Sequence, residues 1–247
     1  MNHLLSTATS REEADRAAAI AVLPIGSFEQ HGEYLPLSTD TLIACVIARE
    51  IADTYNLMLL PPITISCSHE HAEWPGTVSI SARTLDALIT DVAASLTARG
   101  IDRLLLVNGH GGNYVLANIV QEASVHGPKM ALFPTSSDWR QARDVAGLST
   151  DNHVDMHAGE LETSILLHAL PDVVRPGYDA ADHEANDRQH LLTHGMRAYT
   201  ANGVIGRPSL ATEDKGKALL IAFIDLARAH IDALLSAKPD DSIEPAS

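Results

Sequence analysis

The chain has 247 residues, a length that suits a single domain of the α/β class with a sizeable core. Its 17 Lys and Arg face 32 Asp and Glu, and the net charge of −15 opposes binding to nucleic acid or to an anionic membrane. We therefore expect a small molecule or a short peptide as the substrate.

No apolar run is long enough to cross a bilayer and the amino terminus shows no signal-peptide pattern, which predicts a cytoplasmic protein. Cys45 and Cys67 lie in apolar surroundings without a CxxC pattern, so we expect buried thiols.

The first chemical signal follows an apolar run at Val22–Ile25, which predicts a buried strand. Glu29 and His31 come just past its carboxyl end, where open α/β sheets build their sites. In extended backbone, a spacing of one residue turns both side chains to the same side. Asp40 precedes a predicted helix over 41–54 and can act either as a metal ligand or only as a helix cap. Carboxylates and imidazoles are ligands of zinc, manganese and iron.

The next segment reads as a strand over 57–65 that is broken by two prolines, followed by the loop SCSHEHAEWPGT. His69 and His71 alternate in this loop as a ligand pair would. Trp74 opens a turn that leads to a predicted short strand over 78–81. Ordinary surface polarity explains most of this loop equally well.

A predicted helix over 84–99 leads to an apolar strand at 103–107, of the kind found in the middle of a parallel sheet. The loop NGHGGN follows, before a predicted helix over 115–126. Three glycines around His110 allow the backbone to come close to whatever this imidazole touches. The GxGxxG and Walker patterns are absent, which argues against a phosphate-binding loop.

A strand and a helix are predicted over 129–145, and the run DMHAGELETS then leads into a helix over 165–170. His157 and Glu160 are three residues apart, so on a helix they share one face, whereas Glu162 would point elsewhere. The alternative is that the two acids only complement the helix dipole.

The region 171–207 predicts loops, and a long amphipathic helix is predicted over 214–235. Three histidines of the loop region are expected to be solvated, with an oligomer interface or a substrate lid as the alternative: His183, His190 and His194. The tail 236–247 is expected to be disordered.

The strand ends and the HAGE segment should meet at one edge of a parallel sheet. The candidate ligands gathered there are Glu29, His31, Asp40, His110 and Glu160. Three carboxylates are too many for a structural zinc site, which favours thiolates. They suit a site of two cations with a bridging carboxylate.

Four ordered motifs carry a family resemblance: PIGSFEQHG with the later LPLSTD, the WPGT turn, LVNGHGGN and HAGELETS. Together they resemble the creatininase (creatinine amidohydrolase) family over nearly the whole chain. The resemblance implies that one metal is held by Glu29 and His110, that the other is held by His31 and Glu160, and that Asp40 bridges them.

The match has departures. The family's namesake has a glutamate ligand at the position of Gly112 and lacks an acid at the position of Glu160. The resemblance is therefore to another branch, in which Glu160 replaces the missing carboxylate, and creatinine itself is a less expected substrate. The family's usual Phe is Trp74 here, and His71 matches a histidine that often precedes the turn. We assign His71, Trp74 and Asn113 to substrate binding.

The resemblance also implies a three-layer α/β/α fold with a mainly parallel sheet, a single domain over 1–235, and a homo-oligomer, often a hexamer. The implied activity is an amidohydrolase that acts on non-peptide C–N bonds and cleaves an amide, cyclic amide or formamide by a metal-bound hydroxide. It would use two divalent metal ions, with zinc first and manganese or iron as alternatives. His157 would relay a proton to the leaving nitrogen, and Glu162 would orient a ligand or His157.

Three other functions are kept open or weighed against this one. A creatininase-like peptidase that trims the precursor of a peptide-derived redox cofactor shares the same motifs. A non-catalytic metal-binding protein could keep the same cluster without turnover. A metal-dependent phosphatase or nuclease could use the same acids, but the acidic balance and the absence of a basic cluster argue against a polyanionic substrate.

Overall fold

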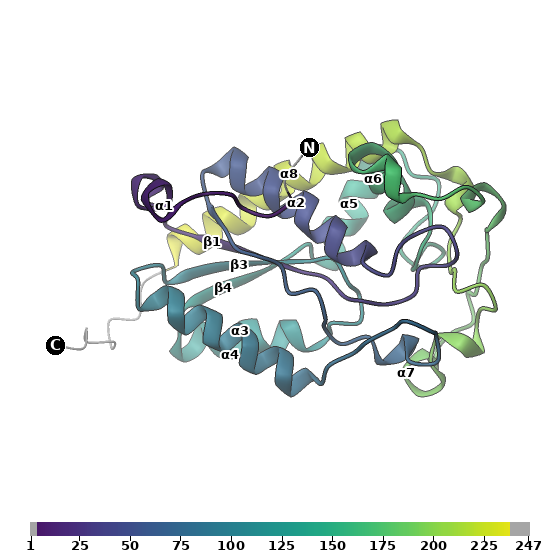
Figure 1. Cartoon of the computed structure of the whole chain (residues 1–247), viewed down its shortest axis with the longest axis horizontal. Coiled ribbons are helices and arrows are strands. Elements are labelled where there is room, and N and C mark those ends of the chain that lie inside the picture. Colours follow the sequence, from purple (N-terminus) through teal and green to yellow (C-terminus); the bar gives the residue numbers. More distant parts are fainter. Residues whose placement is uncertain (1–3, 238–247) are drawn as a thin grey trace.

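A computed structural model describes residues 4–237, and its centre is a parallel sheet of four strands in the order β2-β1-β3-β4 (Figure 1). The strands are β1 (Ala21–Ile25), β2 (Met58–Leu59), β3 (Arg103–Asn108) and β4 (Lys129–Phe133). In the register, Val22 pairs with Leu59 on one side and with Leu105 on the other. Every residue of β1 is buried, as expected for a strand covered on both faces.

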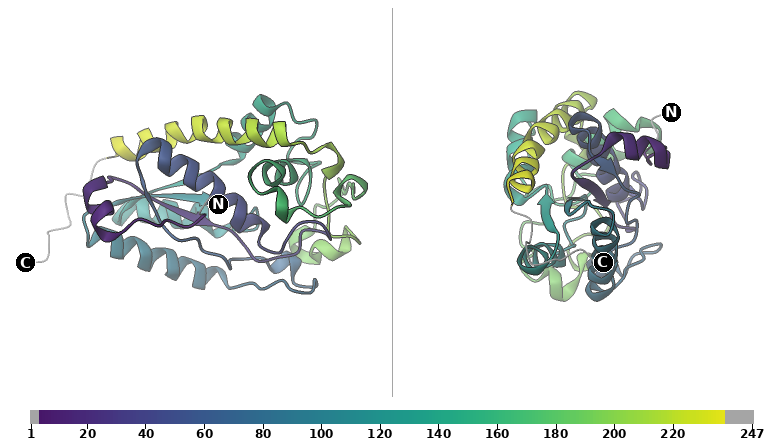
Figure 2. Two further views of the ribbon diagram at one scale, coloured as in Figure 1. Left: turned by 45° about the horizontal axis from the view of Figure 1, so that its top comes forward. Right: turned by 90° about the vertical axis from the view of Figure 1, so that its left-hand side faces the viewer.

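Helices cover both faces of this sheet. The helices of the described chain are α1 (Ser10–Arg16), α2 (Thr39–Tyr55), α3 (Ala82–Thr97), α4 (Val115–His126), α5 (Ser136–Ala146), α6 (Glu160–Ala169), α7 (Leu191–His194) and α8 (Glu213–Ser236). Helices α2, α5, α6 and α8 lie on one side of the sheet, while α3 and α4 lie on the other (Figures 1 and 2). The three-layer α/β/α fold predicted from the sequence is confirmed.

The apolar side chains of the strands alternate between two cores, because successive residues of a strand point to opposite faces. Leu105 and Val107 pack with Phe223 of α8 on one face. Leu104 and Leu106 pack with residues of α3 on the other face. In Figure 2, α8 runs along the length of the molecule beside α2. The loops after the strands are thereby held at one end of the molecule, together with α6 and α7 (Figure 1).

Three local predictions were wrong. The strand expected over 57–65 shortens to Met58–Leu59, because the two prolines that follow lack the N–H groups a sheet requires. The strand expected over 78–81 reduces to one isolated bridge between Phe28 and Val78. Helix α6 starts at Glu160, five residues before the predicted start.

The remaining segments are short turns. A 3₁₀ turn spans His69–His71, and the region 171–207 holds α7 and further 3₁₀ turns. The tail predicted to be disordered lies outside the described residues, except for Ser236, which ends α8, and Ala237. Within residues 4–237, no helix combines the length and the apolar character needed to cross a membrane.

Candidate metal centre

Two glycines let the start of α2 press against the loops that follow the strands. A Cβ on Gly26 would lie 2.3 Å from the Thr41 backbone, and a Cβ on Gly109 would lie 2.3 Å from the carbonyl oxygen of Asp40. Any side chain at either position would force the helix away. Asp40 is in the first turn of α2, where the helix dipole favours a carboxylate, and Ser27 Oγ donates to its Oδ2 at 2.6 Å.

Asp40 stands between two imidazoles. Its Oδ1 lies 2.9 Å from His31 Nε2, and its Oδ2 lies 3.0 Å from His110 Nδ1. His110 Nδ1 is also 3.2 Å from Glu29 Oε1. All four side chains are at most 5% exposed. The structure thus brings together four of the five ligands expected from the sequence.

The turn before α6 brings a further carboxylate to the same place. Asp155 caps α6 by accepting from Glu160 N at 2.6 Å, and only glycine fits at 159, because a Cβ there would lie 1.6 Å from Asp155 Oδ1. Ala158 takes a positive φ of 53° and donates its N–H to Glu162 Oε2 at 2.6 Å. This tight turn holds Glu162 toward His31 and Asp40.

Three groups of side chains can each offer ligand atoms within 4.8 Å of one another: Glu29, Asp40 and His110; His31, Asp40 and Glu162; and Glu29, His31 and His157. The first two groups have only Asp40 in common. This is the arrangement expected of two neighbouring cation sites that share a carboxylate.

Glu160 is not part of this cluster. Its carboxylate accepts from the N–H groups of Ser149 and Thr150 and from Thr150 Oγ1, and it pairs with Lys215 Nζ. The first turn of α6 therefore directs Glu162 rather than Glu160 to the ligands, the reverse of the helical-face argument from the sequence. That argument assumed a helix through His157, whereas the helix starts at Glu160 and the turn at Ala158 changes the direction of the chain.

Backbone carbonyls fix one protonated ring nitrogen in each of three imidazoles. Because a carbonyl only accepts, the ring nitrogen beside it must carry the proton. These contacts are His31 Nδ1 with Glu29 O at 3.1 Å, His110 Nε2 with Cys67 O at 2.9 Å, and His157 Nε2 with Gln30 O at 2.7 Å. In each ring the other nitrogen faces the cluster. In His31 and His110 it lies against the Asp40 carboxylate, and the nearby carboxylates raise the pKa of both rings despite their burial. When its proton is displaced, this nitrogen offers a lone pair. Such a lone pair is what a metal ion or a transferred proton needs.

The surroundings in the cluster shift the pKa values of its members in different directions. Burial disfavours the charged form of His31, but the Asp40 carboxylate outweighs it and raises the pKa of His31 to about 9. Burial lowers the pKa of His71 to about 4 and that of His157 well below its usual value. Burial also raises the pKa of Glu162 to about 7. His71 and His157 are therefore neutral at pH 7.

Glu29 provides the test of whether a metal fits. Its side chain is 0% exposed, and neither carboxylate oxygen has a hydrogen-bond partner with acceptable geometry among the described residues. A buried carboxylate without such partners costs several kcal/mol unless a cation compensates it. No Lys or Arg forms an ion pair with Glu29 in the described part of the chain. The donor set, of oxygen and imidazole nitrogen, fits zinc or manganese.

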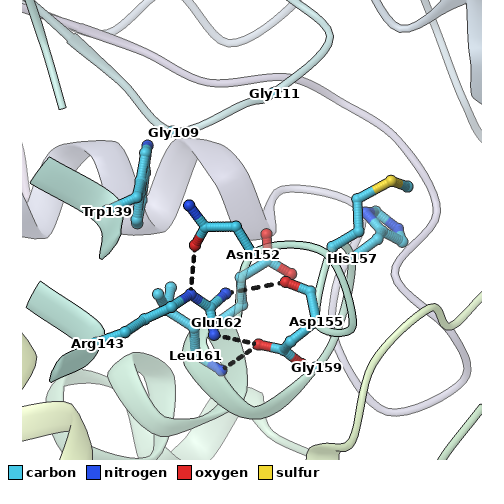
Figure 3. Close-up of a pocket in the computed structure, with 11 residues that line it drawn as sticks. Gly109, Gly111, Trp139, Arg143, Asn152, Asp155, His157, Gly159, Leu161 and Glu162 are labelled. Atoms are coloured by element: carbon cyan, nitrogen blue, oxygen red, sulfur yellow. Dashed lines mark hydrogen bonds and ion pairs between the residues drawn. The ribbon is translucent and has the colours of Figure 1, made fainter. Parts of the chain in front are cut away.

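A cavity of about 140 Å³ opens beside the cluster (Figure 3). His157 and Glu162 line it from the cluster side, and Trp139 and Met156 supply apolar wall. Arg143 lies at its edge but is fully engaged, since it donates to the side chains of Asn152 and Asp155 and to further oxygens.

A second cavity, of about 380 Å³, lies beyond the glycine loop. Glu70, Gly112, Tyr114 and Leu192 line it, the last from α7. The segment 183–194, for which a lid was only the alternative to solvated histidines, thus contributes part of a cavity wall.

The predicted substrate-binding residues have different surroundings. His71 is buried, with its Nε2 3.3 Å from Glu29 Oε1. Trp74 stacks under the guanidinium of Arg197 at 4.4 Å from the ring centroid. The amide of Asn113 is used within the protein, because it accepts from Cys67 N and donates to Asn108. Asn113 therefore stabilises the glycine loop through these two hydrogen bonds.

Comparisons with known proteins agree with this fold. A model of the creatininase family, described as creatinine amidohydrolase, matches residues 5–231. The chain belongs to the creatininase family. A mycofactocin precursor peptide peptidase from Mycobacterium ulcerans is 34% identical over 234 residues, which cover 90% of this chain and 87% of that relative.

Solved creatininases share the fold. A creatininase mutant described as the Zn-Zn type aligns with a TM-score of 0.78 at 23% identity over 95% of this chain and 99% of that one. A creatininase described with manganese aligns with a TM-score of 0.77 at 23% identity over 92% of this chain and 97% of that one. The chain is a hydrolase that acts on C–N bonds, as the motifs predicted.

This creatininase-family chain fills the space at Gly112 from another segment. A Cβ on Gly112 would lie 2.0 Å from Glu70 Oε1 and 2.4 Å from His110 Nε2. Glu70 is 12% exposed, and its Oε1 is 3.7 Å from His110 Nε2. The acid beside position 112, where the family's namesake has a glutamate ligand, is therefore Glu70, from the loop that precedes the WPGT turn. Glu160 is engaged elsewhere.

Two further residues of the site carried weak signals in the sequence. Gln30 stands between Glu29 and His31 in the first motif, where a neutral amide gave no reason to single it out. Glu70 is one acid of the polar loop SCSHEHAEWPGT, where surface polarity is a sufficient explanation for an acid. The only sequence signal for Gln30 was its place inside the first motif. The position of Glu70 beside Gly112 is visible only in the folded chain.

Proposed function

We propose that this protein is a metal-dependent peptidase that hydrolyses an amide bond in a short precursor peptide. The observation that carries the hydrolytic part is the pair of buried ligand groups that share Asp40. The relative with 34% identity, a peptidase by its name, favours a peptide over a small amide.

Five of the residues would hold two divalent cations: Glu29 and His110 one of them, His31 and Glu162 the other, and Asp40 both. Cations bound there supply Lewis acidity, which polarises the carbonyl of the scissile amide and makes water a better nucleophile at neutral pH. Zinc is our first choice and manganese the second, since both accept oxygen and imidazole ligands.

His157 is placed to move the proton. Its Nε2–H is fixed on Gln30 O, so the free Nδ1 lone pair faces the cluster, 3.8 Å from Glu29 Oε1. Because the ring is neutral at pH 7, Nδ1 can accept a proton from the attacking water. It can then return that proton to the nitrogen of the leaving amine.

The two cavities support a peptide substrate. One is lined by Gly109 and Gly111 and the other by Gly112, so both border the same glycine loop above His110. A peptide that crosses this loop can place one side of the scissile bond in each cavity. A small amide needs only one. The homo-oligomer expected from the family resemblance remains part of the proposal.

The test is hydrolysis of a synthetic mycofactocin precursor peptide by metal-reconstituted protein, followed by mass spectrometry, with creatinine and a formamide tested in parallel. We expect two peptide fragments whose masses sum to that of the peptide plus one water. They should be absent with Asp40→Asn, whose neutral amide cannot serve as a shared carboxylate. Turnover of only the small amides would overturn the peptidase proposal and keep the hydrolase.

A further inference from the structure

Gln30 is buried at the centre of the site, and the orientation of its amide is fixed by two backbone groups. Its Oε1 accepts from Gly32 N at 3.0 Å, and its Nε2 donates to Gly203 O at 3.0 Å. An N–H can only donate and a carbonyl can only accept, so the amide cannot be turned over. Gly203 makes room for it, since a Cβ there would lie 1.9 Å from Gln30 Oε1.

The second hydrogen of Gln30 Nε2 has two ring nitrogens within reach, His71 Nδ1 at 3.1 Å and His157 Nε2 at 3.2 Å. The His157 nitrogen donates to Gln30 O at 2.7 Å and cannot also accept, so this hydrogen goes to His71. His71 Nδ1 must accept because the amide nitrogen can only donate. The proton of the neutral His71 ring therefore sits on Nε2, 3.3 Å from Glu29 Oε1. His71 presents an N–H to the cluster, whereas the neutral His157 ring presents the lone pair of Nδ1.

We propose that Gln30 is a positioning residue that keeps the proton of His71 on Nε2, so that His71 presents an N–H to Glu29 and does not act as another metal ligand. This inference deepens the proposed function and rests on it for its catalytic consequence. With its proton on Nε2, 3.3 Å from Glu29 Oε1, His71 turns no lone pair toward the cluster. Without the Gln30 donor, the His71 proton can move to Nδ1, and the bared Nε2 becomes a competing ligand.

The test uses Gln30→Glu, which replaces the NH₂ donor by an oxygen, and Gln30→Met, which removes the donor without adding charge. Gln189→Glu is the matched control, because Gln189 is exposed and lies outside the cluster. The first readout is the ¹⁵N chemical shifts of His71 in the metal-free protein at pH 7. We expect Nε2–H in the wild type and in the control, and a rise of the Nδ1–H form in both Gln30 variants.

The second readout separates positioning from folding. In cobalt-reconstituted protein, the ligand-field spectrum should change in the Gln30 variants as His71 enters the coordination sphere. The kcat for the peptide should fall about 10- to 100-fold with KM changed less than about twofold. If Gln30→Glu does not fold, Gln30→Met decides. A His71 ring that stays Nε2–H in both variants would overturn the inference, even if the peptide proved to be the wrong substrate.

Discussion

Two acids in the first turn of α6 give opposite predictions for the same chemical change, Glu to Gln. Glu160 lies outside the metal cluster, and its carboxylate is 0% exposed and paired with Lys215. Glu162 lies in the cluster and has no Lys or Arg ion pair among the described residues. Comparison of the two variants therefore distinguishes an effect on the stability of the fold from an effect on metal binding.

For Glu160→Gln we expect a loss of about 3 kcal/mol in the free energy of unfolding. Removal of one partner of a buried ion pair costs roughly 3 to 5 kcal/mol, and the lower figure applies because Lys215 is 21% exposed and the Gln oxygen still accepts from the backbone. For a domain of this size, that loss lowers Tm by about 6 to 12 °C. The variant should keep the wild-type metal content.

For Glu162→Gln we expect the reverse. Burial raises the pKa of Glu162 to about 7, so the folded metal-free chain favours the protonated acid, which Gln resembles in shape and charge. The proton on this acid stabilises the fold fully below pH 4.5, and this contribution is lost as the pH rises through 7. At pH 8, metal-free Glu162→Gln should therefore be at least as stable as the metal-free wild type. The free energy of unfolding of the variant at pH 8 should lie within about 1 kcal/mol of the variant's own value at lower pH.

Thermal unfolding of the metal-free proteins, together with elemental analysis after reconstitution, checks both variants. Glu162→Gln should lose one metal equivalent or more. Retention of all metal by Glu162→Gln, with loss of metal from Glu160→Gln, would refute the assignment and restore the ligand expected from the sequence.

Three further predictions concern metal affinity, the packing of α6 against α8, and assembly. In a competition titration, the apparent metal affinity should fall by about tenfold per pH unit for each proton that the metal displaces. The fall should begin below pH 9 for the proton of His31 and below pH 7 for that of Glu162. An affinity that does not change with pH would contradict this prediction. Gly216→Ala should lower the unfolding free energy by about 1 to 3 kcal/mol, because its Cβ would lie 1.9 Å from Ser164 O between α6 and α8; an unchanged Tm would show that the helices separate freely. Light scattering should give a mass several times the 26.4 kDa of one chain, and a monomer would remove the homo-oligomer from the proposal.

The sequence predicted the ligands that follow strands better than those that start a helix. Glu29, His31 and His110 lie in loops directly after β1 and β3, and parallel strands bring their carboxyl ends to one edge. Their convergence therefore required only the strand assignment. Asp40 converges as well, because glycines at 26 and 109 let α2 approach.

The choice between Glu160 and Glu162 depended on where α6 begins, and that is a weak point of sequence patterns. A helix continued back through His157 would bring Glu160 to the cluster. The actual turn has Ala158 at positive φ, a conformation that alanine rarely adopts and that the sequence therefore does not predict. The tie between Ala158 N and Glu162 is visible only in three dimensions.

Anomalous diffraction from crystals of the metal-reconstituted protein, recorded at the absorption edge of the bound metal, shows directly whether the cluster holds two cations. We expect two peaks roughly 3.5 to 4 Å apart on either side of Asp40, one contacted by Glu29 and His110 and the other by His31 and Glu162. Crystals without a peak in this cluster, or with peaks that Glu160 contacts, would contradict it.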